Sequence, residues 1–418
     1  MERIVMISKT IRNNWKKSTF AAVVVGYAVN KAKEKYDINI LMRAACKEAA
    51  KYGDALIPMD QSPMLVTVIL NPVANKRNAK QDFETYCEPI LQLAGLQLNV
   101  IQTTAEGNAK DVMESLSGTE AIIVAGGDGT LSETVTGLLR RNDGANQFPL
   151  GVLPLGRTNT FGNTLFPGGD GVDRVKQLID ASMAIVKGNT TLKDAMKIEP
   201  IAQDNEPPNR PIFALSSVEW GAFRDTLARK DKYWFVGSLR DYASFLFNGY
   251  KESLTWDCRG TIKYTPPCSG CSNCIPKRPE IKTHWSFFMP ANVKVAKEEE
   301  RPLNPECLNV QELCFKSSEF IIRTPNIENN PDQPALKVVL GKNMYSYTEF
   351  VSEGWSRLKG NESENETVKA RTIELIPESP KDGVVIEIDK EEFDVKPVRI
   401  TLLPKIVKLF CNHQLNSI

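Results

Sequence analysis

The sequence predicts a protein of two parts, an α/β domain followed by a β-rich domain. Between Met64 and Gly188, short β-branched runs alternate with stretches of helical periodicity, which is typical of a mostly parallel sheet covered on both faces. After about Thr190, strand-like runs follow one another with few helical stretches between them, which favours two packed antiparallel sheets. We therefore divide the chain into a leader at 1–60, an α/β part at 61–190 and a β-rich part at 191–418.

Composition excludes several classes of protein. The chain has 418 residues, enough for two domains, and a formal net charge of +1, which argues against a nucleic-acid binder held by a basic face. It has only two histidines, His284 and His413, both far along the chain from the glycine-rich turn described below, so a histidine base is not expected. Nine cysteines without a regular framework do not indicate a secreted domain held by disulfides.

The leader is basic and contains one apolar run. From Arg3 to Lys33 it has no acidic residue, and the run at Phe20–Val29 is too short to span a bilayer comfortably. No convincing small-residue cleavage site follows that run. Such a segment is typical of organelle targeting or of interfacial binding, so we expect membrane attachment without a true span. The alternative is a disordered tail with one apolar patch.

The α/β part is predicted because strand patterns and helical patterns alternate along this stretch of the sequence. Strand patterns lie at 64–70, at 96–101, in the run that starts at 121, and at 149–155. Helical patterns lie near 83–91, 109–116, 131–139 and 172–186, with Gly95 and Gly188 as stops for the first and last of them. Ligands in such sheets gather at the carboxyl ends of the strands. The residues expected there are Asn71, Thr104, Asp128 and Asn159.

A glycine-rich turn stands at the centre of the prediction. A buried strand from Ala121 leads into Gly126, Gly127, Asp128 and Gly129, and a helix follows. Thr130 and Glu133 have the spacing of a capping box, which predicts the start of that helix. Bare backbone N–H groups at a helix N-terminus form a phosphate site, and the glycines allow close approach or a positive φ. Asp128 fits such a site if it binds a cation or handles a proton; a plain structural turn is the alternative.

The β-rich part has strand patterns and one helix-like exception. The strand-like runs are 211–215, 320–324, 336–340, 371–376, 384–388 and 398–403, and the exception is 233–247. The last segment could return to the first domain. Residues 258–307 are rich in Pro, Cys, Lys and Glu and predict a long surface insertion.

Within that insertion, three cysteines have regular spacing. Cys268, Cys271 and Cys274 form C-x2-C-x2-C, with Cys258 and His284 as further candidates. The spacing would suit zinc or an iron–sulfur cluster, but no second C-x2-C pair completes the pattern. A metal site, a local disulfide and an incidental loop all remain open.

These motifs together resemble a known family. AGGDGT follows a buried strand, NP closes the first strand, and PLGRTNTFG closes the fourth, as in the diacylglycerol kinase catalytic-domain superfamily. This superfamily contains lipid kinases acting on sphingosine, ceramide and diacylglycerol, and it shares its nucleotide-binding half with NAD kinases. The stretches VAGGDGTLSETVTGLLRR, WGAFRDTLARKDKYWFVG and IDKEEFDVKPVRITLLPKIVKLFC are most similar to its mitochondrial acylglycerol kinase branch. The resemblance covers roughly Met64 to the C-terminus.

The resemblance implies a set of site residues. ATP, with Mg²⁺, would be the phosphate donor, bound by the glycine turn and its surroundings, and a lipid hydroxyl would be the acceptor. Asp128 is a tentative Mg²⁺ ligand, Arg240 falls where the family places a basic phosphate contact, and Asp389 is a candidate base at a strand end. If Asp389 merely ends its strand, the base would be Asp128. The remaining nucleotide-binding candidates are Asn71, Thr104, Gly126, Gly127, Gly129, Thr130 and Gly156.

The chain departs from the family pattern in two places. The second acidic motif, usually Asp-Gly-Glu, reads Asp389-Lys390-Glu391, so its backbone geometry is open; Asp382-Gly383 lies a strand too early. The usual Gly-Asn-Asp of the third loop has become Thr158-Asn159-Thr160, which removes an acid from that loop. Neither a G-x-x-x-x-G-K-[ST] loop nor the H-R-D and D-F-G motifs of protein kinases occur.

We therefore expect an ATP-dependent lipid kinase with an NAD kinase- or diacylglycerol kinase-like α/β domain and a β-rich sandwich that binds lipid. Its acceptors would be monoacylglycerol and diacylglycerol, giving lysophosphatidic and phosphatidic acid. We expect it at the mitochondrial inner membrane or in the intermembrane space, attached to the membrane surface and without a nucleic-acid partner. The alternatives are a sphingosine or ceramide kinase, an NAD kinase, and a component of a mitochondrial protein-import complex in which kinase activity is secondary.

Overall fold

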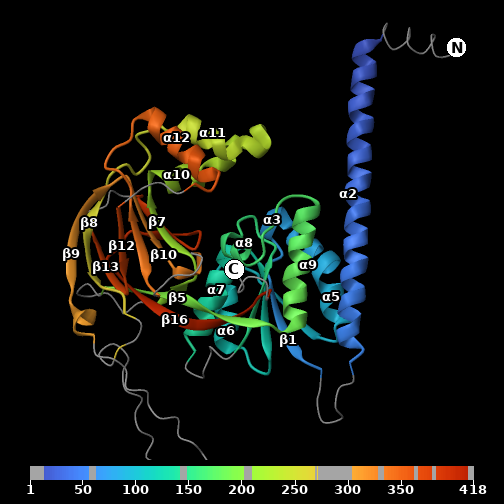
Figure 1. Cartoon of the computed structure of the whole chain (residues 1–418), viewed down its shortest axis with the longest axis horizontal. Coiled ribbons are helices and arrows are strands. Elements are labelled where there is room, and N and C mark those ends of the chain that lie inside the picture. The colour runs from blue at the N-terminus through green and yellow to red at the C-terminus, as the bar shows by residue number, and fades with distance from the viewer. Residues whose placement is uncertain are drawn as a thin grey trace, which may run out of the picture.

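The computed structural model describes residues 14–55, 63–141, 148–201, 210–268, 271, 304–327, 334–361, 366–378 and 383–412. Within them, the strands form one ten-stranded sheet and one six-stranded sheet. Figure 1 shows the α/β part beside the β-rich part, with a long N-terminal helix standing at the outer edge.

The first half is built on four parallel strands, in the order β2-β1-β3-β4. Their bounds are β1 Leu65–Leu70, β2 Gln97–Gln102, β3 Ala121–Gly126 and β4 Leu150–Pro154. β1, β3 and β4 are buried along nearly their whole length, because helices cover both faces of the sheet. The predicted parallel α/β domain is confirmed.

Helices cover this sheet on both sides (Figure 1). α6 (Asn108–Ser115) and α7 (Asp128–Leu139) lie on one face, and α5 (Glu88–Leu93) and α9 (Val172–Lys187) lie on the other. α9 is amphipathic, and it ends at Gly188, which has φ +69° as its stop position requires. The helix predicted near 83–91 is present as α4 (Ala79–Asp82), a π-helical segment (Phe83–Cys87) and α5, after the short α3 (Ala74–Arg77).

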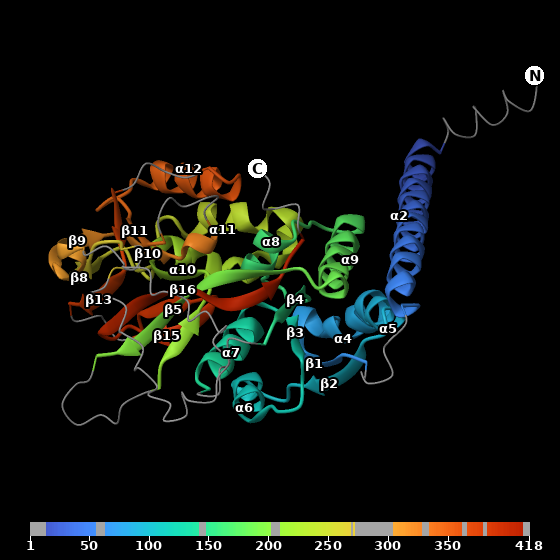
Figure 2. The same ribbon diagram turned by 60° about the horizontal axis from the view of Figure 1, so that its bottom comes forward.

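The leader contains a single long helix, α2 (Trp15–Gly53). Its second half packs on α5 and α9, where Ala45 and Ala49 are buried against Ile90, Val175 and Met183. Its first half projects away from the rest of the chain (Figures 1 and 2) and leaves its apolar side chains exposed. The exposed side chains are Trp15, Phe20, Val23, Val24, Val25, Tyr27 and Val29. None of the helices that the structure describes has the combination of length and hydropathy needed to span a bilayer.

The second half is a sandwich of antiparallel strands. One layer is the six-stranded sheet, in the order β12-β11-β10-β7-β14-β15, and the other contains β16, β13, β8, β9 and β5. Large aliphatic and aromatic residues fill the space between the layers, including Trp220, Phe320 and Ile373. The bounds are β5 Thr190–Pro200, β7 Ser217–Gly221, β8 Cys258–Thr265, β9 Gln311–Ser317, β10 Glu319–Arg323, β11 Leu336–Leu340, β12 Glu366–Ala370, β13 Thr372–Pro377, β14 Val385–Ile388, β15 Glu391–Asp394 and β16 Val398–Phe410. The predicted β-rich sandwich is confirmed.

One strand belongs to both halves. The first part of β16 pairs with β13 and β5, and its end at Leu409 meets Leu150 of β4 in parallel. Ile400 and Leu402 therefore lie in the core of the sandwich, whereas Leu409 and Phe410 lie in the core of the α/β half. The last segment of the chain thus returns to the first half.

A group of helices caps one end of the sandwich (Figures 1 and 2). It consists of α10 (Ala222–Ala228), the 3₁₀ helix η3 (Lys230–Leu239), α11 (Arg240–Asn248) and α12 (Tyr347–Leu358), packed around Phe223, Phe245 and Phe350. We expected one helical segment near 233–247, but the structure has several helices here. α12 begins with a full capping box between Ser346 and Glu349, a pattern that could have predicted it.

The expected insertion starts later than Cys258. β8 occupies 258–265 and pairs with both β13 and β9, so its first residues are interior strand rather than surface loop. Cys258 is fully buried there. The Lys and Pro residues that follow β8 led us to place the start of the insertion too early in the sequence.

Candidate functional site

The glycine turn joins β3 to α7 by close packing. Gly127 has φ −104° and ψ −168°, so an extended backbone, and not a positive φ, precedes the helix. A Cβ at Gly127 would lie 2.9 Å from the Thr158 carbonyl oxygen, and one at Gly156 would lie 2.2 Å from the Gly127 Cα. The β3 turn and the loop after β4 therefore touch through bare backbone. Close approach is the reason that glycine is needed here.

The predicted capping box is wrong. α7 begins at Asp128, so Thr130 lies inside its first turn rather than ahead of it. The Thr130 hydroxyl accepts a hydrogen bond from the Asn71 side-chain nitrogen at 3.1 Å. The Glu133 carboxylate instead accepts from the backbone N–H groups of Gly107 and Ala109, at 2.7 and 3.1 Å, and so caps the neighbouring helix α6. Sequence spacing could not show that a helix from elsewhere would take this carboxylate.

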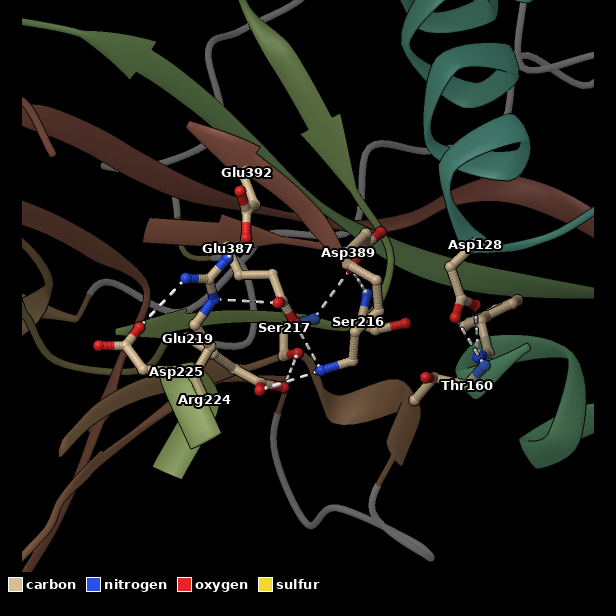
Figure 3. Close-up of polar contacts among 12 residues, drawn as sticks. Asp128, Thr160, Ser216, Ser217, Glu219, Arg224, Asp225, Glu387, Asp389 and Glu392 are labelled. Atoms are coloured by element: carbon tan, nitrogen blue, oxygen red, sulfur yellow. Dashed lines mark hydrogen bonds and ion pairs between the residues drawn. The ribbon is translucent and has the colours of Figure 1, made fainter. Parts of the chain in front are cut away.

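Asp128 is buried and tied to the next loop (Figure 3). Its two carboxylate oxygens accept from the backbone N–H groups of Thr160 and Phe161, at 2.8 and 3.2 Å. These two residues begin the short helix α8 (Thr160–Leu165). The family's acid in this loop is replaced by Thr160, and the carboxylate of Asp128 reaches across to the loop's backbone.

The third loop is held in shape by Asn159. Its side chain accepts from the Gly156 N–H at 3.0 Å and donates to the Gly156 carbonyl oxygen at 2.9 Å. The N–H of Gly156 also donates to the carbonyl of Gly126 at 2.9 Å. Gly126, Gly127, Gly156 and Asp128 thus form one connected unit at the carboxyl ends of β3 and β4, where the sequence placed them.

Asp389 lies across from this unit, in the turn between β14 and β15 (Figure 3). Its carboxylate is buried and accepts from three backbone N–H groups, those of Leu215, Ser216 and Ser217, at 2.6, 2.8 and 3.0 Å. Burial raises the pKa of Asp389 from 3.8 to about 6; the three hydrogen bonds oppose this shift, and the charge of Asp128 adds to it. The two predicted acids therefore share one electrostatic environment.

The lysine that replaces the family's glycine keeps the turn. Asp389 and Lys390 have φ of +45° and +71°, as the two central residues of a two-residue hairpin require. The Lys390 ammonium pairs with Glu387 at 2.7 Å and with Glu219 at 3.0 Å. These ion pairs offset the strain of a left-handed lysine and fasten the hairpin to β7.

Arg224 completes the network that supports this hairpin (Figure 3). Its guanidinium, on α10, contacts Glu387 at 3.0 Å, Asp225 at 3.1 Å and also Glu392. A charged group this deeply buried is stable only when its donors are paired. The Asp389 backbone is therefore positioned by β7, α10 and β15 together.

Glu391 is a site residue that the sequence reasoning missed. A Cβ added to Gly129 would meet the Glu391 carboxylate oxygen at 2.9 Å, so this side chain lies over the first turn of α7. Burial, together with the nearby charges of Glu133, Glu106 and Asp389, raises the pKa of Glu391 to about 8. Its place in the Asp389-Lys390-Glu391 motif was the available signal, but only Asp389 of this motif was considered as a site residue.

Arg240 and Thr104 occupy the edges of the site. Arg240 begins α11 and lies 3.9 Å from Asp231, which in turn pairs with Arg157 of the third loop at 2.5 Å. Arg240 is thereby linked to the loop that contains Gly156. Thr104 is exposed, and its N–H donates to the Asn108 side chain at 3.2 Å, so it supports the start of α6 rather than the glycine turn.

A second missed feature is the turn after β1. Asn75, Lys76 and Arg77 have φ of +48°, +56° and +71°, a run of left-handed residues without glycine. Such strain is found most often at functional sites, and Lys76 and Arg77 are exposed close after Asn71. The basic pair that follows Asn71-Pro72 was the available sequence signal.

A cavity of about 850 Å³ separates the two halves next to Glu391. One wall comes from α6 and α7 and carries Lys110 and Glu133; the other comes from the sandwich and is mostly apolar. The apolar lining comprises Ile198, Ile212, Val218, Ile386, Ile388, Phe393, Val398 and Ile400. A polar end beside the glycine turn therefore continues into an apolar space.

Comparison with known proteins identifies the same two parts. Residues 65–198 match the diacylglycerol kinase catalytic domain, and residues 215–417 match the acylglycerol kinase C-terminal model. A putative diacylglycerol kinase from Bacillus anthracis has a similar structure, with a TM-score of 0.55 at 17% identity, covering 85% of this chain and 100% of that one. This likeness confirms the diacylglycerol kinase-like fold.

Relatives match over nearly the full length. The mitochondrial acylglycerol kinase of Homo sapiens is 32% identical over 97% of this chain and 96% of its own length. That of Xenopus laevis is 33% identical over 99% of this chain and 96% of its own. Because these matches span both halves and the leader, the chain belongs to the acylglycerol kinase family.

Proposed function

We propose that this protein is an ATP-dependent lipid kinase that phosphorylates the hydroxyl of monoacylglycerol and diacylglycerol, giving lysophosphatidic and phosphatidic acid. The observation that carries the proposal is the cavity between the halves. The cavity has a volume of about 850 Å³ and a lining that is mostly apolar on the sandwich side, and its polar residues include Glu391, which lies over the first turn of α7. A substrate with a hydrophobic tail and a reactive hydroxyl fits this division.

The nucleotide would bind at the turn and the first turn of α7. The first N–H groups of a helix lack intrahelical acceptors, and the helix dipole favours an anion. Here the Asp128 N–H already donates to the Thr158 carbonyl oxygen at 3.1 Å, so a phosphate would use the N–H groups beside it. The residues that border this position are Asn71, Thr130 and the glycine positions 126, 127, 129 and 156. Arg240 is connected to the third loop through Asp231 and Arg157, and we propose it as a phosphate contact. Lys76 and Arg77 are further candidates for phosphate contact.

The carboxylates fit a magnesium ion, which prefers oxygen ligands. Asp128 uses its oxygens for two N–H groups, and a carboxylate retains further lone pairs for a cation. Burial is the main reason that the pKa of Glu391 is raised, and the charges of Glu133, Glu106 and Asp389 add to it; a divalent cation would offset those charges. Asp128 would hold the ion, and Glu391, which lies over the first turn of α7, is a further candidate ligand. Mg²⁺, when bound, would neutralise charge on the transferring phosphoryl group.

Asp389 is the proposed base. The lipid hydroxyl oxygen forms a bond to the γ-phosphorus while the bond to the leaving ADP oxygen breaks, and the hydroxyl proton passes to a carboxylate. A group with a pKa of about 6 is ionised at neutral pH and can accept that proton late in the reaction. The hydrogen bonds from Leu215, Ser216 and Ser217 hold this carboxylate in one orientation in the turn between β14 and β15.

Membrane attachment is proposed for the first half of α2. Its exposed aromatic and aliphatic side chains, with Lys16 and Lys17, suit the interface of an anionic bilayer. The helical cap also exposes Trp234, Phe235 and Leu239. The first half of α2 and the cap helices α11 and α12 lie toward the same side of the molecule (Figures 1 and 2). The names of the relatives support a mitochondrial location, and we propose the inner membrane or the intermembrane space.

The test is direct. The purified full-length protein is incubated with labelled ATP and separate micelles of monoacylglycerol, diacylglycerol, sphingosine and ceramide, with and without Mg²⁺. We expect labelled lysophosphatidic and phosphatidic acid that require the metal. Labelling of sphingosine or ceramide instead would replace the proposed acceptor, and in a parallel sample that contains NAD in place of lipid, labelling of NAD would replace the class of substrate. If no acceptor is labelled but the protein co-purifies with a mitochondrial import complex, the scaffold alternative would be favoured.

A further inference from the structure

Three cysteines far from the catalytic cleft come together at one end of the sandwich. Cys268 follows β8, Cys271 lies three residues further on, and Cys307 lies in the 3₁₀ helix η5 (Pro305–Leu308). Their sulfur atoms all lie within 4.8 Å of one another, and the residues are 7%, 3% and 2% exposed. We propose that Cys268, Cys271 and Cys307 bind a structural zinc ion as thiolates.

The geometry suits three of the four ligand positions around one tetrahedral ion. Zinc binds cysteine sulfur at about 2.3 Å, so thiolates around one ion lie roughly 3.8 Å apart. Sulfur atoms already gathered within 4.8 Å need only small side-chain adjustments to reach that spacing. The C-x2-C spacing of Cys268 and Cys271 is the usual arrangement for two zinc ligands on one loop, with further ligands from a distant segment.

The surroundings provide hydrogen-bond donors to the sulfurs. The Asn304 side-chain nitrogen donates to Cys268 Sγ at 3.7 Å, and the Arg371 guanidinium donates to Cys307 Sγ at 3.8 Å. Asn304 is held in this orientation because its oxygen accepts from the Glu306 N–H at 3.1 Å. Donors of this kind stabilise metal-bound thiolates, and the Arg371 charge offsets part of their negative charge.

Cys258 shows the contrast with an isolated buried cysteine. It lies at the start of β8, is fully buried, and has its thiol pKa raised well above the usual value by burial. A cysteine without a metal or donor partner in such a place stays a neutral thiol. The three-cysteine cluster differs from Cys258 in two ways. Its sulfur atoms lie close to one another, and two of them accept hydrogen bonds from the side-chain N–H groups of Asn304 and Arg371.

The site overlaps the cysteine motif of the insertion. That motif comprised Cys268, Cys271 and Cys274, with Cys258 and His284 as further candidates; Cys274 and His284 lie outside the described residues, and Cys258 is interior strand. Among the described residues, Cys307 joins Cys268 and Cys271, although it is remote in sequence. An ion here would join the end of β8 to the segment before β9, and closing a long loop in this way favours the folded state.

The position argues for a structural role. β8 and β9 lie at the side of the sandwich opposite α7 (Figures 1 and 2). The cavity and the glycine turn are lined by other strands. Loss of the ion should therefore lower stability first and affect turnover only through unfolding.

The test is metal analysis of the full-length protein purified without chelator. We expect about one zinc per chain, as a single site of this kind requires. Replacement by Co²⁺ should give the visible charge-transfer absorption of cobalt thiolates. Cys268→Ser, Cys271→Ser and Cys307→Ser should each lose most of the zinc, whereas Cys314→Ser, an exposed cysteine on β9, should retain it.

A second measurement keeps the test decisive if a serine variant fails to fold. A zinc chelator added to the wild-type protein should lower its melting temperature, and added zinc should restore it. Protein free of metal with two of these cysteines joined as a disulfide would overturn the proposal. Iron with acid-labile sulfide would overturn it in favour of a cluster. Equal zinc loss in Cys314→Ser would also contradict it.

Discussion

At the scale of single residues, Asp389 has the most demanding position. It accepts three backbone N–H groups and sits in a left-handed turn, yet its pKa is raised to about 6 because it is buried. An asparagine side chain accepts hydrogen bonds only at its oxygen, because its nitrogen is a donor. Asp389→Asn should therefore cost about 1–3 kcal/mol of stability. If Asp389 is the base, turnover should also fall by about 10²–10⁴-fold while ATP affinity stays nearly intact.

The measurement is turnover, ATP binding and melting temperature in parallel, with Glu312→Gln at an exposed position of β9 as control. A normal turnover for Asp389→Asn would move the base role to Asp128. The wild-type profile should rise from acid pH through about 6, where Asp389 loses its proton, and the variant should lack this step.

The same residue makes stability depend on pH in a defined direction. The pKa of Asp389 is higher in the folded chain than its ordinary 3.8, so the folded state binds the proton more tightly. Its contribution to the free energy of unfolding is therefore fully present below about pH 4 and is lost as pH rises through about 6. Glu391 acts in the same direction up to about pH 8.

The contact between the glycine turn and the loop after β4 can be tested by substituting Gly156. A Cβ there would lie 2.2 Å from the Gly127 Cα, and backbone cannot move aside cheaply. Gly156→Ala should weaken ATP binding by roughly tenfold or more, since each 1.4 kcal/mol is a factor of ten. Gly26→Ala, where a Cβ meets nothing within 4 Å, is the matched control. Unchanged nucleotide affinity in Gly156→Ala would refute the close-approach argument.

At the scale of elements, α2 combines two roles in one helix. Its second half is part of the packed α/β half, and its first half carries the exposed apolar side chains. A chain that starts at Lys31 should remain folded, become more soluble and keep activity on detergent-dispersed lipid, while binding to anionic vesicles drops. A chain that starts at Asp60 loses the buried Ala45 and Ala49 as well and should melt at a lower temperature.

The two truncations are compared by thermal melting, vesicle sedimentation and activity. Equal vesicle binding by the Lys31 chain and the full chain would show that α2 is not the membrane anchor. Complete loss of activity on dispersed lipid, with the melting temperature unchanged, would show that the helix also acts in catalysis.

At the scale of the whole molecule, β16 couples the two halves. Ile400 and Leu409 are both fully buried, one in the sandwich core and one in the α/β core. We expect Ile400→Ala and Leu409→Ala each to cost about 2–5 kcal/mol. Because one strand is shared, both variants should lower the same thermal transition, measured by calorimetry. Two separate transitions, each shifted by only one variant, would mean that the halves unfold independently.

The sequence by itself determined the elements of the α/β half and the identity of its turn. The four strand patterns, the stop at Gly188 and the GGDGT stretch depend on local periodicity and on backbone requirements, which neighbouring residues reveal. Likewise, the presence of two antiparallel layers followed from runs of β-branched residues. Local patterns of this kind carry information because helix and strand periods differ.

Only the tertiary structure decided which side chains meet. Glu133 caps a neighbouring helix, Lys390 holds a left-handed turn through Glu219 and Glu387, and Cys307 joins Cys268 and Cys271. Each of these contacts joins segments that are distant in sequence, so no local spacing predicts it. The raised pKa of Glu391 has the same origin: burial and the charges of other segments set it, and both exist only once the chain has folded.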